Sequence, residues 1–261
     1  MEEMSAGRHR MGGRPALLAS AFVAGLLVAG ALAGGESGAV VPPSAEGGTF
    51  AGPMPIGCTS APGRMVSRGP GSRRQVALTF DDGPSSEQTP AILAILDRFH
   101  VDATFFEEGR HVAGREELMR EILGSGDEIG NHSFDHPHYP GPAELARTDG
   151  AIRRATGFEP CLFRPPYGLL DATEEAAADA DRLETILWTF DSGDDHHPPP
   201  ARIVRHVLAT AHAGSIILMH DGGHHPQTVT ALPAVIRGLL ARGFEFDTVT
   251  RLLGGRFVYP A

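Results

Sequence analysis

From residue 75 onward, short apolar stretches alternate with longer segments in which apolar residues recur every three or four positions. Short runs rich in β-branched and aromatic residues are typical of strands, and the longer repeat is typical of helices that face a core. The short runs predict strands at 76–80, 103–106, 128–130, 162–164, 183–190, 215–219 and 244–249. The longer repeats predict helices at 89–99, 115–123, 142–155, 172–180, 202–211 and 228–241.

This order corresponds to about seven β/α units, which is typical of a parallel sheet. The chain carries no glycine-rich nucleotide fingerprint and no internal repeat. We therefore expect an α/β fold whose sheet is a closed or nearly closed barrel rather than an open sheet, in one domain over residues 75–261.

The N-terminal region has a different composition. Three arginines in the first 14 residues precede an uncharged apolar run at 16–33, which ends in the small-residue pattern Ala-Leu-Ala. This order predicts a secretory signal peptide over residues 1–33, with an uncleaved membrane anchor as the alternative because the run is near the lower length limit of a span. The Gly-, Pro- and Ser-rich residues 34–74 are expected to form an irregular linker. The domain would then be secreted or cell-wall associated or, with an anchor, held outside the cell at the membrane.

The charge balance limits the choice of partners. The 261 residues carry a formal net charge of −10, which argues against nucleic acid because a phosphate binder needs a basic patch. A neutral polymer such as a polysaccharide remains compatible, and we expect a monomer. The two cysteines, Cys58 and Cys161, could pair in an exported chain or remain two buried free thiols.

Polar residues that could carry chemistry follow the predicted strands at their C-terminal ends. They are Asp81, Asp82, His132, His136, Arg164, Asp191, Asp194 and His220. In a β/α barrel those strand ends meet on one face, where active sites are built. The positions therefore predict one shared site, although an Asp-Asp-Gly-Pro segment taken alone also suits a simple turn.

The spacing of His132 and His136 is i, i+4. On a helical turn this spacing places both imidazoles on one side, as a divalent metal requires. Together with an aspartate from another strand end they would form a set of two histidines and one carboxylate. The alternative is a pair of surface histidines, which is how we interpret 196–197 and 224–225 among the 13 histidines.

Five segments resemble, in order, the motifs of the polysaccharide deacetylase family, also called carbohydrate esterase family 4. They are TFDDGP at 79–84, the His132–His136 pair, FRPPYG at 163–168, Asp191 with Asp194, and LMH at 218–220. The resemblance spans residues 75–253. It implies a distorted (β/α)7-type barrel and metal-dependent removal of acetyl groups from an N-acetylated polysaccharide or oligosaccharide, such as peptidoglycan or a chitin-like polymer.

By motif position, the resemblance implies that Asp82, His132 and His136 bind a divalent metal. Zinc is the first choice for such a ligand set, and cobalt, nickel, manganese and iron are alternatives.

The resemblance also implies catalytic roles. Asp81 would be the general base and His220 the general acid. Arg164 would pair with Asp81, Asp194 would orient His220, and the backbone N–H of Tyr167 would contribute to an oxyanion hole. These roles suit amide hydrolysis, in which water must be activated, an oxyanion stabilised and the departing amine protonated.

One residue departs from the family pattern. The fourth motif usually ends in Trp, which packs beside the catalytic histidine, and Asp195 occupies that place here. The sequence leaves open whether Asp194, Asp191 or Asp195 serves His220; we expect Asp195 to face solvent and Trp188 to lie in the core. Two other functions stay open: hydrolysis of O-acetyl esters such as acetylxylan or of small amides, and a catalytically weakened carbohydrate-binding wall protein.

Overall fold

The computed structural model describes residues 53–261. The predicted signal segment and residues 34–52 of the expected linker lie outside the described residues. The strands are β1 (Gly57–Cys58), β2 (Met65–Val66), β3 (Gln75–Gly83), β4 (Thr104–Glu107), β5 (Glu128–Asn131), β6 (Leu162–Phe163), β7 (Glu184–Ile186), β8 (Phe190–Asp191), β9 (Ile216–His220), β10 (Glu245–Phe246) and β11 (Phe257–Val258). The helices are α1 (Gln88–Phe99), α2 (Gly109–Val112), α3 (Glu116–Gly124), α4 (Pro142–Thr156), α5 (Ala172–Ala180), α6 (Pro200–Thr210), α7 (Pro226–Ala241) and α8 (Val249–Leu252), with short 3₁₀ turns η1 (Pro166–Gly168) and η2 (Asp194–His196).

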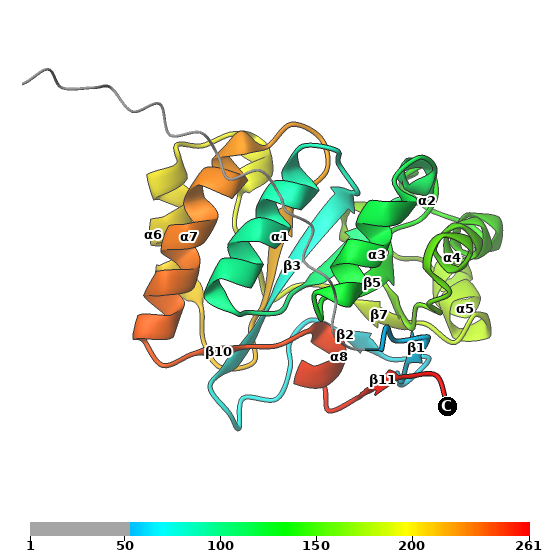
Figure 1. Ribbon diagram of the computed structural model, residues 1–261. Coiled ribbons are helices and arrows are strands. Elements are labelled where there is room, and N and C mark those ends of the chain that lie inside the picture. Colours follow the sequence, from blue (N-terminus) through cyan, green and yellow to red (C-terminus); the bar gives the residue numbers. More distant parts are fainter. Residues whose placement is uncertain (1–52) are drawn as a thin grey trace, which may run out of the picture. The chain divides into compact units, whose positions relative to one another are not determined.

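The main sheet is parallel and has the strand order β2-β7-β6-β5-β4-β3-β9-β8, with β10 pairing the start of β3. Helices pack around its outside, and β3 runs through the middle of the view in Figure 1. Thr189 Oγ1, which directly precedes β8, donates to the carbonyl of Ser67 beyond β2 at 2.8 Å, so the two edge strands approach each other. The prediction of an α/β barrel with parallel strands is confirmed.

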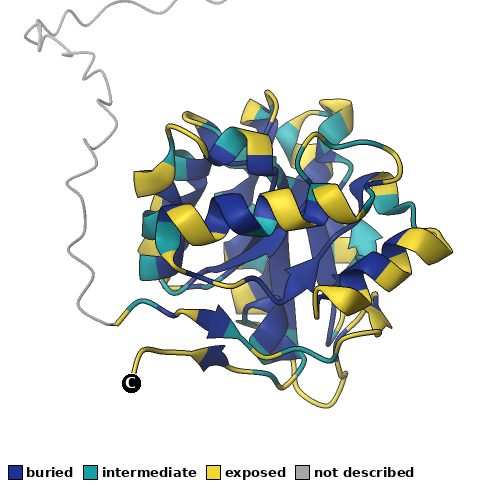
Figure 2. Cartoon of the chain, turned by 90° about the vertical axis from the view of Figure 1, so that its right-hand side faces the viewer, coloured by how far each residue is buried: buried dark blue, intermediate teal, exposed yellow. Residues whose placement is uncertain are grey.

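The central strand β3 shows why the sequence folds this way. Successive strand side chains point to opposite faces. Val76, Leu78 and Phe80 belong to the main core cluster, in which Phe80 stacks on Phe105 of β4 at 5.1 Å between ring centroids. Thr79 and Asp81, on the opposite face, meet polar partners inside the barrel. Figure 2 shows the buried strands in dark blue, enclosed by helices whose outer faces are exposed.

Local sequence signals set the helix ends. The side chain of Asp171 accepts hydrogen bonds from the first turn of α5, and Glu174 bonds back to its backbone, which forms a capping box. Helix α4 begins with Pro142 in its first turn and ends at Gly157, whose φ of 78° is left-handed and suits glycine. Among the described residues, no helix is long and apolar enough to cross a membrane.

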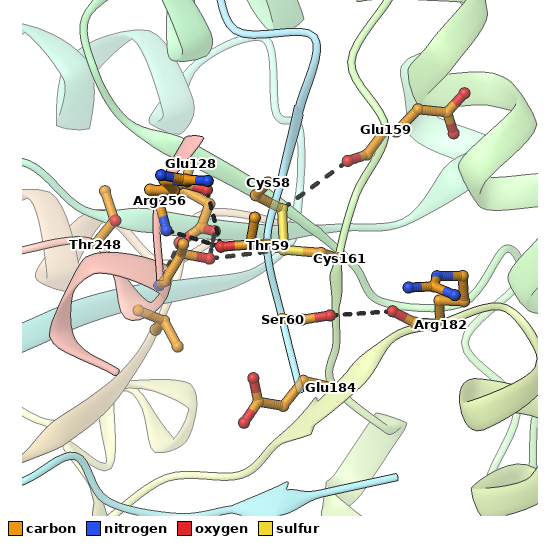
Figure 3. The surroundings of a disulfide bond; sticks show 12 residues. Cys58, Thr59, Ser60, Glu128, Glu159, Cys161, Arg182, Glu184, Thr248 and Arg256 are labelled. Carbon is orange, nitrogen blue, oxygen red and sulfur yellow. Dashed lines mark hydrogen bonds between the residues drawn. A yellow bond between two sulfur atoms is a disulfide. The ribbon is translucent and has the colours of Figure 1, made fainter. Parts of the chain in front are cut away.

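The domain starts earlier than the sequence analysis predicts. Residues 53–74 of the expected linker contain β1, which pairs antiparallel with β11, and β2, which pairs with β7. Cys58 and Cys161 form a disulfide across a sequence separation of 103 residues (Figure 3). The two cysteines are therefore paired and are not free thiols. In the same figure Thr59 Oγ1 donates to the carbonyl of Arg256 at 3.2 Å. Composition alone misses this segment because its strands are only two residues long.

Two other expected strands differ. The single strand expected at 183–190 is divided into β7 and β8, with Trp188 between them. The last expected strand, 244–249, contains only the two residues of β10, and helix α8 begins at Val249. Thr248 causes this change, because its side chain accepts from the Arg251 N–H and caps the helix.

Candidate active site

Asp81 and Asp82 lie at the C-terminal end of β3, where the strand carries an irregularity. The pairing register with β4 shifts between Asp81 and Gly83, and Asp82 has a φ of 73°. A β-bulge of this kind redirects a side chain, so two consecutive carboxylates reach the same site. Non-glycine residues with positive φ are strained and cluster at functional sites.

Asp81 is buried and forms an ion pair with Arg164. Arg164 Nη1 lies 2.7 Å from Asp81 Oδ1 and donates to Thr79 Oγ1 at 2.8 Å. The guanidinium also donates to the carbonyl of Ile186 at 3.1 Å and lies over the ring of Phe106, which fixes its position. Arg164 is fully buried, so its charge acts on Asp81 with little screening by solvent. The structure thus brings the expected base and its expected partner together.

Asp82, His132 and His136 also meet. Asp82 Oδ1 lies 3.3 Å from Nε2 of His132 and 3.3 Å from Nε2 of His136. Ligand atoms about 2.1 Å from a tetrahedral ion lie about 3.4 Å from one another. His132 Nδ1 donates to the Arg164 carbonyl at 2.7 Å, so its Nε2 is the nitrogen that faces the cluster. These residues therefore fit a divalent metal ion.

The charges of this cluster also suit a cation. Burial raises the pKa of Asp82, but the hydrogen bond and charge of His132 outweigh it and hold that pKa well below its usual range. Burial, aided by the charge of His132, lowers the pKa of His136 to about 4. Burial lowers the pKa of His132, but Asp81 and Asp82 outweigh it and the pKa is raised. A metal bound here would displace that proton, because a ligating imidazole must be neutral.

The histidine pair does not lie on a helical turn, contrary to the expectation from its spacing. Ser133 and His136 have positive φ values of 64° and 55° and belong to a loop. The loop is tied by Asn131 Oδ1, which accepts from the Ser133 N–H at 2.8 Å, and by Glu144, which accepts from the backbone of residues 134 and 135. Side chain–backbone bonds of this kind compete with helix formation.

On the other side of β3, His220 at the end of β9 pairs with Asp194. The distance between His220 Nδ1 and Asp194 Oδ1 is 2.8 Å, and Asp194 Oδ2 accepts from the His220 N–H and from Thr228 Oγ1. Burial lowers the pKa of His220, but the hydrogen bond and charge of Asp194 outweigh it and raise it to about 10. His220 is therefore held protonated, as a general acid must be.

Comparison with known proteins agrees with the family resemblance of the five motifs. The family model described as polysaccharide deacetylase matches residues 68–185. A peptidoglycan-N-acetylglucosamine deacetylase of Bacillus cereus is 36% identical over 193 residues, which cover 70% of this chain and 90% of that protein. The chain belongs to the polysaccharide deacetylase family.

Two further members show that proteins of this family differ in length and in activity. A peptidoglycan-N-acetylglucosamine deacetylase of Listeria monocytogenes is 36% identical over 70% of this chain, which spans only 40% of that longer protein. A solved structure described as a carbohydrate esterase family 4 pseudoenzyme from Bacillus anthracis matches with a TM-score of 0.68 and 32% identity, over 74% of this chain and 70% of that one. Membership therefore does not by itself establish activity.

Within this polysaccharide deacetylase domain, the carboxylates that follow β8 have different surroundings. Asp191 Oδ1 accepts from the Gly193 N–H at 2.7 Å, and Asp195 pairs with exposed His196 at 3.3 Å. Only Asp194 contacts His220 among these three. Asp195 is half-buried: its Oδ2 pairs with His196, whereas its Oδ1 is buried and has no hydrogen-bond partner among the described residues. The expectation that Asp195 faces solvent is therefore wrong for one of its two oxygens.

The third motif lies beside the metal candidates. Tyr167 has a φ of 59°, and its ring lies 4.6 Å from the ring of His136, so its side chain borders the same site. The Tyr167 side chain is 56% exposed. Trp188 is not fully buried in the core as expected: it is half-buried, and a Cβ at Gly168 would lie 2.7 Å from its indole. This contact supports the turn that carries Tyr167.

The candidate site contains two further buried carboxylates, Glu107 and Asp221, which the sequence motifs do not include. A Cβ at Gly83 would lie 2.3 Å from Asp221 Oδ2 and 2.5 Å from Glu107 Oε2, so both carboxylates converge on the space that this glycine leaves. Burial, followed by the neighbouring carboxylates, raises the pKa of Glu107, and burial raises that of Asp221 to about 7. Their adjacency could not be read from the sequence because they come from different strands. The raised pKa values favour the protonated, neutral form of both carboxyl groups beside Asp81 and Asp82.

Proposed function

We propose that the chain is a metal-dependent N-deacetylase of polysaccharides that contain N-acetylglucosamine, with cell-wall peptidoglycan as its substrate. One observation supports this most strongly. The two histidine candidates and Arg164 come from the β5 and β6 side of β3, whereas the His220–Asp194 pair comes from the β9 side. A base and an acid are thus available on two sides of one cation-binding cluster, as amide hydrolysis requires.

Asp82, His132 and His136 would hold the ion, with zinc as the first choice for a set of two imidazoles and one carboxylate. When bound, such an ion lowers the pKa of water and polarises a carbonyl. The remaining roles belong to the protein's own side chains and, for the oxyanion, to a backbone N–H.

Asp81 is the general base and takes a proton from the attacking water. Its Oδ1 is engaged by Arg164 at 2.7 Å, while its Oδ2 lies 3.7 Å from His132 Nε2, next to the proposed metal. Arg164 thereby fixes the carboxylate with one oxygen directed to the reacting centre. The Tyr167 N–H would stabilise the oxyanion.

His220 is the general acid and gives its proton to the departing sugar amine. Amines leave poorly as anions, so a donor that remains protonated at neutral pH is required. The contact with Asp194 supplies this state and fixes the Nδ1–H, so that the other ring nitrogen faces the site.

The substrate class is supported by the named relatives, which act on the N-acetylglucosamine of peptidoglycan. The net charge of −10 agrees with a substrate that is not a polyanion such as nucleic acid. The Cys58–Cys161 disulfide supports a location outside the reducing cytosol, as action on the wall requires.

The proposal is tested by measuring acetate release from peptidoglycan, chitooligosaccharides and acetylxylan with the metal-loaded protein. We expect release from peptidoglycan and, more slowly, from chitooligosaccharides. Release from acetylxylan alone would replace the N-deacetylase with an O-acetyl esterase. Binding to the polymers without acetate release would instead identify a carbohydrate-binding protein like the pseudoenzyme.

A further inference from the structure

Two histidines that the proposed reaction does not use lie beside the proposed acid. The ring of His225 lies 5.4 Å from the ring of His220, tilted by 43°. The ring of His197 stacks on His225 at 5.1 Å with an interplanar angle of 21°. His197 is exposed and His225 is half-buried. The three rings therefore form a stack that leads from the surface to His220.

The stack is tied to the partner of His220 by Gln227. This buried amide donates through Nε2 to the carbonyl of Asp194 at 2.7 Å. The same nitrogen lies 3.2 Å from Nδ1 of His197 and 3.4 Å from Nδ1 of His225. The amide carries two N–H donors, so beside the bond to Asp194 it has one N–H left, and the nearer acceptor for it is Nδ1 of His197. Burial, followed by the charge of His220, lowers the pKa of His225, which favours its neutral form.

The loop that carries His225 is held from helix α1. With its amide oriented to suit its neighbours, Gln88 donates to the carbonyls of Asp221, Gly222 and Gly223 and accepts from the His225 N–H at 2.7 Å. Gln88 is itself buried. The backbone at His225 is therefore fixed, and the ring is presented to His220 by a supported loop.

The residue after Asp194 does not cover the ring of His220. Asp195 stands where an aromatic residue would provide an apolar wall, and its carboxylate pairs with His196 instead. Without another ring, one side of His220 would be open to water, and water would compete for its contact with Asp194 and screen that charge. His225 lies against His220 and supplies a flat, neutral surface.

We propose that His225 is a positioning residue of this enzyme: its ring, backed by His197, packs against His220 and holds the acid in contact with Asp194. This inference rests on the proposed function, because it assigns His220 the role of general acid. It requires the shape of the His225 ring and not its nitrogens. A phenylalanine should therefore replace it and an alanine should not.

The test compares the metal-loaded variants His225→Ala and His225→Phe. We expect kcat for acetate release to fall on the order of tenfold in the alanine variant, because a loosened catalytic group loses alignment. KM should be unchanged, and phenylalanine should restore kcat. His224→Ala is the matched control in the same loop, because His224 is exposed, and it should behave as wild type. Thermal unfolding of all three variants separates lost alignment from lost folding.

A second measurement does not depend on turnover. The NMR signal of the His220 Nδ1–H reports its bond to Asp194; it should persist in His225→Phe and broaden by exchange with water in His225→Ala. Wild-type kcat and an unchanged signal in the alanine variant would overturn the inference. Equal loss in both variants would also overturn it, by showing that the imidazole nitrogens matter. Absence of acetate release from the wild type would instead defeat the proposed function. The NMR comparison would still show whether the ring of His225 holds His220 in contact with Asp194.

Discussion

Two buried glutamates at opposite ends of the barrel illustrate how stability and function are separated. Glu128, at the start of β5, is buried, and its carboxylate accepts from Thr104 Oγ1 and from the backbone and side chain of Thr250. Glu107, at the end of β4, is equally buried, yet neither of its oxygens meets a hydrogen-bond donor within residues 53–261. Buried polar groups are normally satisfied, and exceptions often mark functional sites.

The surroundings of the two residues follow the same division. Around Glu128 the N-terminal strand ends are covered by α8, by β1 and by the Cys58–Cys161 disulfide (Figure 3). Around Glu107 the C-terminal strand ends carry Asp82 with positive φ and the buried charges of the site. Changes at the first end should therefore reduce stability and leave the chemistry of the folded protein intact, and changes at the second end should do the reverse.

The largest expected effect is that of removing two metal candidates. The double variant Asp82→Ala, His132→Ala should lose both bound metal and acetate release while remaining folded, because it deletes a carboxylate and an imidazole that converge on one point. His136→Ala alone should weaken metal retention by about one order of magnitude or more. Metal content is measured on the purified proteins by elemental analysis. A stoichiometric ion in the double variant would show that the metal binds elsewhere.

Asp81→Asn keeps the shape of the side chain and removes the base. We expect acetate release to drop by about 10²–10⁴. The metal content and the unfolding temperature should change little, since Asp81 is not a proposed ligand. If Asp81 only stabilises a turn, the variant would instead lose stability and keep its turnover per folded molecule.

At the other end, Cys58→Ser tests the disulfide. Closing a loop of 103 residues is expected to contribute about 4 kcal/mol to the free energy of unfolding, so the midpoint of thermal unfolding should fall by on the order of 10 °C. Acetate release at low temperature should remain near wild type. The double variant that also carries Cys161→Ser is the control for a free thiol. A large loss of kcat in folded protein would show that the end of the barrel with the disulfide also affects the chemistry.

The smallest expected effect concerns pH. The pKa of His220 is raised from 6.5 to about 10, so its pairing with Asp194 stabilises the fold fully below pH 6.5 and is lost as the pH rises towards 10. Asp194→Asn removes the charge, so the alkaline limb of the pH–rate profile should shift to lower pH and the rate should fall. Asp195→Asn is the matched control and should barely move the limb. A larger shift from Asp195→Asn would show that the wrong carboxylate has been assigned to His220.

The sequence predicts the parts of this fold in which one pattern dominates. Alternation along β3 determines that Val76, Leu78 and Phe80 face the helices and Asp81 faces the interior. The position of polar residues after strands brings the candidate site together, because a parallel barrel gathers its strand ends on one face.

Prediction from the sequence stops where distant residues decide the local structure. The i, i+4 spacing of His132 and His136 suggests a helical turn, but Asn131 and Glu144 bind the backbone of that loop instead. The cover over His220 comes from His225, which the sequence presents only as one of several paired histidines. Its role depends on a contact across the site that no local pattern encodes.

The most direct test of the central claim is removal and return of the metal. Wild-type protein is treated with a chelator, assayed for acetate release on peptidoglycan, and assayed again after addition of zinc, with circular dichroism recorded throughout. We expect activity to vanish with the ion and to return with one equivalent of zinc, while the fold is retained. Undiminished acetate release from protein shown to be metal-free would contradict the account.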